Sequence, residues 1–150
     1  MHTIPAFDLA KIPTPFFNPA RRVGANDCLQ GDGAPAAIAR MTALLNTTSV
    51  LLPAAKVFVA SMLDVPSGAA KVCQSALNAA LPALVKAAGA NFFYVPVAEN
   101  TVGVCGDDKT TWSCGDGVHP NAGGHARVAS VFALWMRHTL CPDWSPDNSC

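Results

Sequence analysis

The chain has 150 residues, of which 51% are hydrophobic and only 13% are charged. This length suits one ordinary domain, and this composition excludes intrinsic disorder of the charged, apolar-poor kind. Ten basic residues balance ten acidic residues, so no net charge draws the chain to nucleic acid or to an anionic membrane. We therefore expect a small or neutral partner, and the sequence leaves the oligomeric state open.

The N-terminal segment, residues 1–22, contains four prolines, which neither a helix nor a central strand accommodates. It has no early basic cluster and no apolar run of the length that a signal peptide needs. No stretch of the chain approaches the roughly 20 apolar residues of a membrane span. We expect an irregular segment at 1–22, one domain at 23–140, and a C-terminal tail at 141–150.

The first regular elements follow in the order helix, strand, helix. The spacing of apolar residues predicts a helix over 34–45, ending at a Thr/Ser break at 47–49. A nearly continuous apolar run at 55–63 predicts a strand that is buried on both faces. A second helix is predicted from Ser67 to about residue 88, with Pro82 kinking or splitting it. The predicted core faces of the two helices contain Ile38, Met41, Leu44, Leu45, Val72, Leu77, Leu81, Leu84 and Val85.

A second strand and a third helix complete the pattern. Residues 92–97 (FFYVPV) predict a short or edge strand, because the proline cannot donate to a ladder. A loop is expected at 99–117, and Pro120 is expected in the first turn of the last helix. Val128, Val131, Phe132, Trp135 and Met136 form the predicted core stripe of that helix.

This alternation predicts an α/β fold, specifically part of a three-layer α/β/α sandwich with a parallel sheet. Two strands are too few for a stable sheet that is flanked by helices. We therefore expect the second half of a larger domain, with N-terminal strands missing.

Six cysteines point to disulfides rather than to a metal site. Zinc sites favour closely spaced Cys-x-x-Cys pairs, and the sequence contains none. We expect three disulfides, although spacing alone does not fix the pairing, and free thiols in a cytosolic protein are the alternative. The favoured pairs are Cys28 with Cys73, Cys105 with Cys114, and Cys141 with Cys150. Disulfides and the glycosylation sequon at Asn46 together predict an extracellular, secreted protein.

Two short segments at loop-to-helix junctions contain side chains suited to acyl transfer. In the segment 116–120 (DGVHP), Asp116 is close enough to orient the His119 imidazole and leave its other nitrogen free as a base. In Gly24-Ala25-Asn26-Asp27, the Asn26 amide is able to donate to a developing oxyanion. Taken singly, the first segment also fits an ordinary helix start, and the second fits an ordinary turn.

Together and in this order, these segments resemble blocks of the SGNH hydrolases, the GDSL-like esterase and lipase superfamily. Gly24 to Asp27 match the family's Gly-x-Asn-Asp block, and Asp116, His119 and Pro120 match its Asp-x-x-His-Pro block. The resemblance covers residues 24–140 approximately. This part of the chain is similar to the C-terminal portion of secreted fungal and bacterial members, some of which are carbohydrate acetylesterases.

The resemblance implies a carboxylic-ester hydrolase that works through an acyl-serine intermediate without metal or cofactor. It implies that His119 is the base, that Asp116 orients it, and that Asn26 and Gly24 belong to the oxyanion hole. Trp112, in the loop before Asp116, is a candidate for lining the cleft for a carbohydrate or lipid ester. A metal shared by His119 and His125 is the weaker alternative, because no carboxylate ligand has suitable spacing.

The nucleophile of the family has no counterpart in these residues. The Gly-Asp-Ser block is absent, since Gly31-Asp32-Gly33 has glycine where serine is needed, and there is no Gly-x-Ser-x-Gly elbow. We therefore expect an enzyme with little activity whose nucleophile portion is missing or replaced, through truncation, an error in the gene model or natural loss. The alternative is a secreted, disulfide-stabilised binding or interaction module that derives from such an enzyme.

Overall fold

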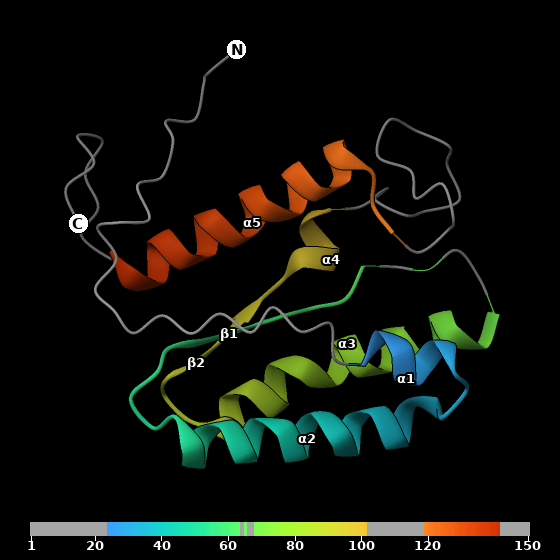
Figure 1. Ribbon diagram of the computed structural model, residues 1–150, viewed down its shortest axis with the longest axis horizontal. Helices are drawn as coiled ribbons and strands as arrows, with labels where there is room; N and C mark the ends of the chain where they lie inside the picture. Colours follow the sequence, from blue (N-terminus) through green and yellow to red (C-terminus); the bar gives the residue numbers. More distant parts are fainter. Residues whose placement is uncertain (1–23, 64, 66–67, 102–118, 142–150) are drawn as a thin grey trace.

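The computed structural model describes residues 24–63, 65, 68–101 and 119–141, and its elements alternate between helices and two short strands (Figure 1). In chain order these are α1 (Ala25–Leu29), α2 (Gly33–Leu51), β1 (Val57–Ala60), α3 (Gly68–Ala88), β2 (Phe92–Val95), α4 (Val97–Asn100) and α5 (Ala122–Leu140). β1 and β2 pair in parallel, with Val57 opposite Phe92 and Ala60 opposite Val95. The α/β class and the parallel sheet are as predicted, whereas the segment 1–22 and residues 142–150 lie outside the described residues.

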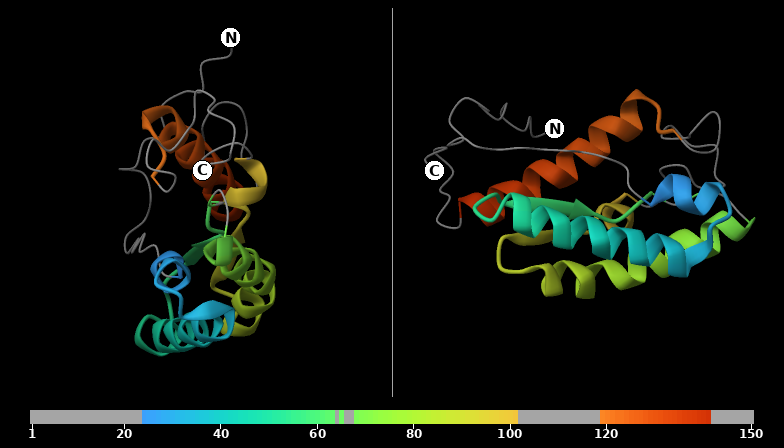
Figure 2. Two further views of the ribbon diagram at one scale, coloured as in Figure 1. Left: turned by 90° about the vertical axis from the view of Figure 1, so that its right-hand side faces the viewer. Right: turned by 60° about the horizontal axis from the view of Figure 1, so that its bottom comes forward.

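The helices lie on both sides of the strands, in layers. α1, α2 and α3 are on one side, and α5 is on the other side (Figure 1, Figure 2). Side chains alternate between the two faces of a strand, so Val57, Val59, Phe92 and Tyr94 pack toward the helices of the first side. Among the described residues, no helix has both the length and the apolar character that crossing a membrane requires.

The hydrophobic core lies between the strands and the helices α1 to α3. Leu77 and Leu81 on α3 are completely buried there, and Ala37 on α2 is buried against them. The buried members of this core are Cys28, Ala37, Met41, Leu45, Cys73, Leu77, Leu81, Val85 and Phe92. No residue of α5 belongs to this core, so the sheet is much better covered on one face than on the other.

The predicted break at 47–49 is wrong, because α2 continues to Leu51. Thr48 donates its hydroxyl to the Leu44 carbonyl and Ser49 donates to the Asn46 carbonyl, so both side chains bond within the helix instead of ending it. The core face is also narrower than predicted, since Leu44 is 40% exposed.

Pro82 does not split the helix, because α3 is one continuous helix from Gly68 to Ala88. Pro82 is exposed, while Leu77, Leu81 and Val85 anchor the helix on both sides of it, so packing outweighs the lost backbone hydrogen bond. Val72, predicted in the core, is 71% exposed.

The remaining differences concern the ends of the elements. The strands are shorter than predicted, and two short helices, α1 and α4, lie where the sequence predicted a turn and a loop. Pro120 is buried just before α5, whose N-cap is Asn121, the side chain of which accepts from Gly124 N–H at 2.9 Å. The predicted stripe on α5 is only half-buried or exposed, with Trp135 39% exposed.

Candidate functional site

Two of the segments singled out from the sequence lie toward the carboxyl end of the parallel sheet. The first turn of α1 and the segment that enters α5 both lie at the end of the molecule toward which β1 and β2 run (Figure 1, Figure 2). In open α/β sheets, ligands bind beyond the carboxyl ends of the strands. This end is therefore the place where the fold favours a functional site.

Gly24 begins α1 in a conformation that requires glycine. Its φ is +102°, and a Cβ atom built on it would lie 2.5 Å from Leu77 Cδ2 and 3.3 Å from Met62 Sδ. A side chain there would be strained in the backbone and would collide with the core. Gly24 therefore lets α1 lie directly against α3 and the segment that follows β1.

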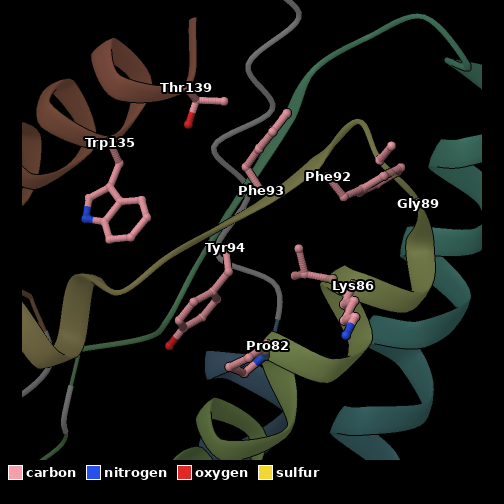
Figure 3. Close-up of a pocket in the computed structure, with 10 residues that line it drawn as sticks. Pro82, Lys86, Gly89, Phe92, Phe93, Tyr94, Trp135 and Thr139 are labelled. Atoms are coloured by element: carbon pink, nitrogen blue, oxygen red, sulfur yellow. The ribbon is translucent and has the colours of Figure 1, made fainter. Parts of the chain in front are cut away.

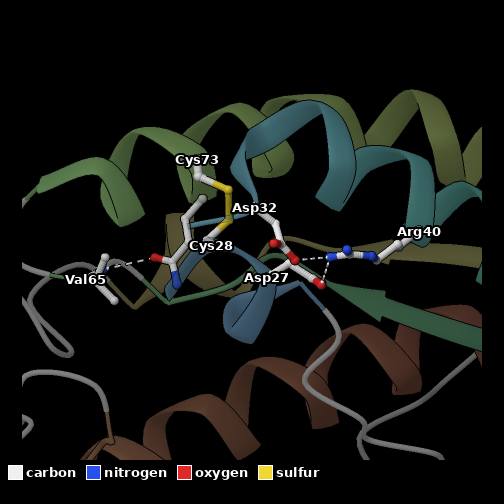
Figure 4. Close-up of a disulfide and its surroundings, with 7 residues drawn as sticks. Asp27, Cys28, Asp32, Arg40, Val65 and Cys73 are labelled. Atoms are coloured by element: carbon white, nitrogen blue, oxygen red, sulfur yellow. Dashed lines mark hydrogen bonds and ion pairs between the residues drawn. A yellow bond between two sulfur atoms is a disulfide. The ribbon is translucent and has the colours of Figure 1, made fainter. Parts of the chain in front are cut away.

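Asn26 and Asp27 lie side by side in α1 but have different surroundings. Asn26 is exposed, and within the described residues its side chain forms no hydrogen bond. Asp27 accepts a hydrogen bond from Arg40 Nη1 on α2, and the same nitrogen also donates to Asp32 (Figure 4). The amide of Asn26 is thus available to a ligand, whereas the carboxylate of Asp27 is already used in holding α1.

His119 lies just before α5 and is exposed to solvent. Its predicted partner Asp116 and the predicted cleft residue Trp112 lie outside the described residues, so the predicted Asp–His pair stays a prediction. No hydrogen bond joins Asn26 to His119, although both segments lie at the same end of the molecule. Within the residues that the structure describes, no group of three His, Cys, Asp or Glu side chains could hold a metal ion.

The segment that leaves β1 is tied to α3 by two polar side chains. Asn78 accepts from Met62 N–H and donates to the Met62 carbonyl, both at 2.8 Å. Buried Gln74 accepts from Val65 N–H at 3.2 Å. These bonds satisfy backbone groups that the sheet leaves unpaired, so they fix one wall of the carboxyl end.

A polar network at the same end was missed by the sequence reasoning. Ser61, which follows β1 and is 3% exposed, donates to Glu99 Oε2 at 2.6 Å and accepts from Ala98 N–H at 2.9 Å. Tyr94 donates its hydroxyl to the other carboxylate oxygen of Glu99. The network joins β1, β2 and α4. A serine directly after a buried strand is the only sequence signal for it.

The ionisation of this network favours an anionic Glu99 beside a neutral Tyr94. Burial, followed by the hydrogen bond to Glu99, raises the pKa of Tyr94 to about 12. Burial alone would raise the pKa of Glu99, but the hydrogen bonds from Ser61 and Tyr94 outweigh it and lower that pKa. The network is thus fully formed near neutral pH.

Of the six cysteines, the described ones are Cys28, Cys73 and Cys141, and all three are oxidised. Cys28 on α1 and Cys73 on α3 form a disulfide, which is one of the three pairs favoured from the sequence (Figure 4). Cys141 is also disulfide-bonded. Cys105, Cys114 and Cys150 lie outside the described residues, so the other two pairings stay predictions. The sequon residue Asn46 is exposed on α2.

A cavity of about 440 Å³ lies away from the candidate site, between the second half of α3, β2 and the second half of α5. Phe93 and Tyr94 on β2 and Trp135 on α5 present aromatic rings to it (Figure 3). Lys86 is the one charged residue among those that line it. It is shaped by the sparse packing of α5 on the sheet.

Comparison of the sequence with models of known protein families identifies the family to which the chain belongs. The model of the GDSL-like Lipase/Acylhydrolase family matches residues 22–127, which is more than half of the chain and includes both α1 and His119. No curated protein and no solved structure gave a match. The match agrees with the parallel α/β fold, and the chain belongs to the GDSL-like lipase/acylhydrolase family of SGNH hydrolases.

Proposed function

We propose that this chain provides the base and the oxyanion-binding part of a site that hydrolyses carboxylic esters. In this proposal His119 takes a proton from the attacking oxygen and returns one to the leaving alcohol, and Asp116 orients its ring. Asn26 donates its amide to the oxyanion, with Gly24 beside it. The single observation that supports this most is that α1 and the segment before α5 meet the same end of a parallel sheet in a family of acylhydrolases.

The 150 residues contain no Gly-Asp-Ser motif, so we expect only slow hydrolysis by these residues alone. Water, with His119 as its base, would replace the missing hydroxyl. Serine hydrolases that lose a triad member retain roughly 10³-fold catalysis over water when the oxyanion site is intact. A fluorophosphonate probe is expected to label no serine, because the sequence has no Gly-Asp-Ser or Gly-x-Ser-x-Gly motif to provide an activated serine.

The test is the hydrolysis of p-nitrophenyl acetate by the full chain and by matched histidine variants. His119→Ala and Asn26→Ala are expected to lower the rate by about fivefold or more, because each removes a group that acts on the reacting atoms. His138→Ala, in the last turn of α5, is the control and is expected to change little. Equal losses for both histidines would contradict the proposal, because free imidazole side chains would then explain the rate.

A high rate of hydrolysis would contradict only one part of the proposal. Turnover at an ordinary enzyme rate of about 10 per second, abolished by His119→Ala, would overturn the prediction of low activity but not the hydrolase assignment. The disulfides support a further proposal, that the protein works in an oxidising, extracellular compartment.

The aromatic cavity favours a second candidate function, a non-catalytic module that binds sugar. The rings of Tyr94 and Trp135 are suited to stack on the apolar faces of a sugar. Xylotetraose is then expected to change the tryptophan fluorescence of the chain, and Trp135→Phe is expected to remove that change. No change in the fluorescence of the parent chain would exclude this candidate.

A further inference from the structure

α1 is a helix that its own hydrogen bonds cannot maintain. It has five residues, and isolated helices shorter than about 12 residues are marginal in water. Its shape and position must therefore be imposed by the elements around it. Three contacts, with α3, with α2 and with the segment that follows β1, do so.

The first contact is covalent. Cys28 and Cys73 are 3% and 5% exposed, and their disulfide joins the middle of α1 to α3, with the two Cα atoms 5.4 Å apart (Figure 4). Because α3 also carries the fully buried Leu77 and Leu81, this bond fastens α1 to the most firmly packed helix of the molecule.

The second contact is ionic and comes from α2. One nitrogen of Arg40 donates to Asp27, within α1, and to Asp32, just after it. The hydrogen bonds to Asp32 and Asp27 raise the pKa of the Arg40 guanidinium, which stays positively charged across the whole usual pH range. The third contact is the close approach of Gly24 to Leu77 and Met62.

Asn26 lies between these contacts, one residue from Asp27 and two residues from both Gly24 and Cys28. We infer that the Cys28–Cys73 disulfide and Arg40 are positioning groups, which hold the Asn26 amide in place for the oxyanion of an ester-hydrolysis intermediate; this rests on the proposed function. A donor that is fixed before the reaction needs no reorganisation when charge develops, which is why its support matters.

Reduction of the disulfide gives a direct way to release α1. Dithiothreitol transfers two electrons and two protons to the sulfur atoms, which yields two cysteine thiols and the cyclic disulfide of the reagent. Two contacts then remain, the packing at Gly24 and the ionic contact to α2, which is weak because the Arg40 side chain is 51% exposed and screened by water. The helices α2 and α3 and the two strands keep their own core.

The experiment measures amide hydrogen exchange in the full chain, oxidised and reduced. The amides of Cys28, Gln30 and Asp32 close hydrogen bonds in and around α1 and serve as reporters. They are expected to exchange about tenfold faster after reduction, while the amides of β2 stay protected. Equal acceleration in all elements would overturn the inference, because the disulfide would then only stabilise the whole fold, and so would unchanged exchange.

The variants separate the two positioning groups from general effects. Cys28→Ala with Cys73→Ala should reproduce the effect of reduction, and Arg40→Ala should give a smaller acceleration that Arg40→Lys partly restores. Lys71→Ala, which removes an exposed positive charge from α3, is the matched control and should change nothing.

A second readout tests whether Asn26 is the group that is being held. Sodium dimethylphosphinate, a tetrahedral anion, is expected to shift the side-chain amide signal of Asn26 in the oxidised chain, and the shift should fall about fivefold after reduction. An equal shift in both forms would overturn the positioning role while leaving the proposed function intact. A shift in neither form, with exchange in α1 still faster after reduction, would instead contradict the proposed function.

Discussion

The two faces of the sheet are supported very differently, and the candidate site draws on both. On one face, α1, α2 and α3 enclose a core in which Leu77 and Leu81 have no exposed surface, and a disulfide crosses it. On the other face, α5 covers the strands with half-buried side chains and leaves Leu134 53% exposed. Asn26 therefore belongs to the firmly packed side, whereas His119 lies just before the less firmly packed helix.

The largest expected effect compares the same substitution on the two faces. Leu81→Ala empties a fully buried position on α3 and is expected to lower the free energy of unfolding by about 3–5 kcal/mol. Leu134→Ala on α5 is expected to lower it by about 0.5 kcal/mol or less. Urea denaturation measures both, and similar losses would contradict the difference in packing between the faces.

The second comparison uses two glycines with the same backbone preference. Gly31→Ala has a positive φ and open space around the new Cβ, so we expect a loss of about 1 kcal/mol. Gly24→Ala adds a collision with Leu77 and is expected to cost about 2–4 kcal/mol. Thermal denaturation of the two variants isolates the collision. Equal shifts would mean that α1 does not lie against α3 as described.

The third comparison uses two serines. Ser61→Ala removes a buried hydroxyl that bonds Glu99 and Ala98, and it is expected to cost about 1–3 kcal/mol. Ser130→Ala removes an exposed hydroxyl that bonds only its own helix, and its effect is expected to stay within about 0.5 kcal/mol. Chemical denaturation distinguishes the two variants. An unchanged free energy of unfolding for Ser61→Ala would contradict a stabilising role for the network.

The smallest effect is a shift in titration, and the chain is well suited to it because Tyr94 is its only tyrosine. Its ultraviolet titration is expected near pH 12, and Glu99→Gln should move the midpoint toward the ordinary value of about 10. A wild-type midpoint near 10 would contradict the network.

The two pKa shifts also set the pH range of stability. The folded pKa of Tyr94 is raised, so its contribution is complete below about pH 10 and is lost as the pH rises through about 12. The folded pKa of Glu99 is lowered, so its contribution is present above about pH 4.5 and is lost as the pH falls through the folded value. Glu99→Gln should remove the acidic part of this dependence, which denaturation at several pH values tests.

The sequence was most informative where apolar runs are long. The two strands are predicted from the apolar runs at 55–63 and 92–97, and α3 is predicted from the helical spacing of Leu77, Leu81 and Val85. The residues of α1 predict a turn rather than a helix, because the helix is stabilised by tertiary contacts from α2 and α3 that the local sequence does not show. Helix α2 passes through its Thr/Ser stretch for a related reason, since local hydroxyl bonds and packing override propensity.

Motif order was more informative than periodicity about the candidate site. It singled out Gly24 and His119 near the ends of elements that the structure brings to the same end of the sheet. The Ser61–Glu99 hydrogen bond joins residues that are 38 positions apart, and no local sequence pattern predicts such a pair. The Arg40 contact to α1 was missed for the same reason.

In the proposed site, Asn26 and His119 bind the same ligand, although Asn26 lies on the well-packed side of the sheet and His119 lies on the side with sparser packing. Titration of the full chain with dimethylphosphinate, followed at the Asn26 side-chain amide and at the His119 ring in the same spectra, tests it most directly. We expect the chemical shifts of both groups to change with a single dissociation constant, and we expect His119→Ala to weaken the response of Asn26. Two different constants, or a response of Asn26 that ignores the loss of His119, would contradict it.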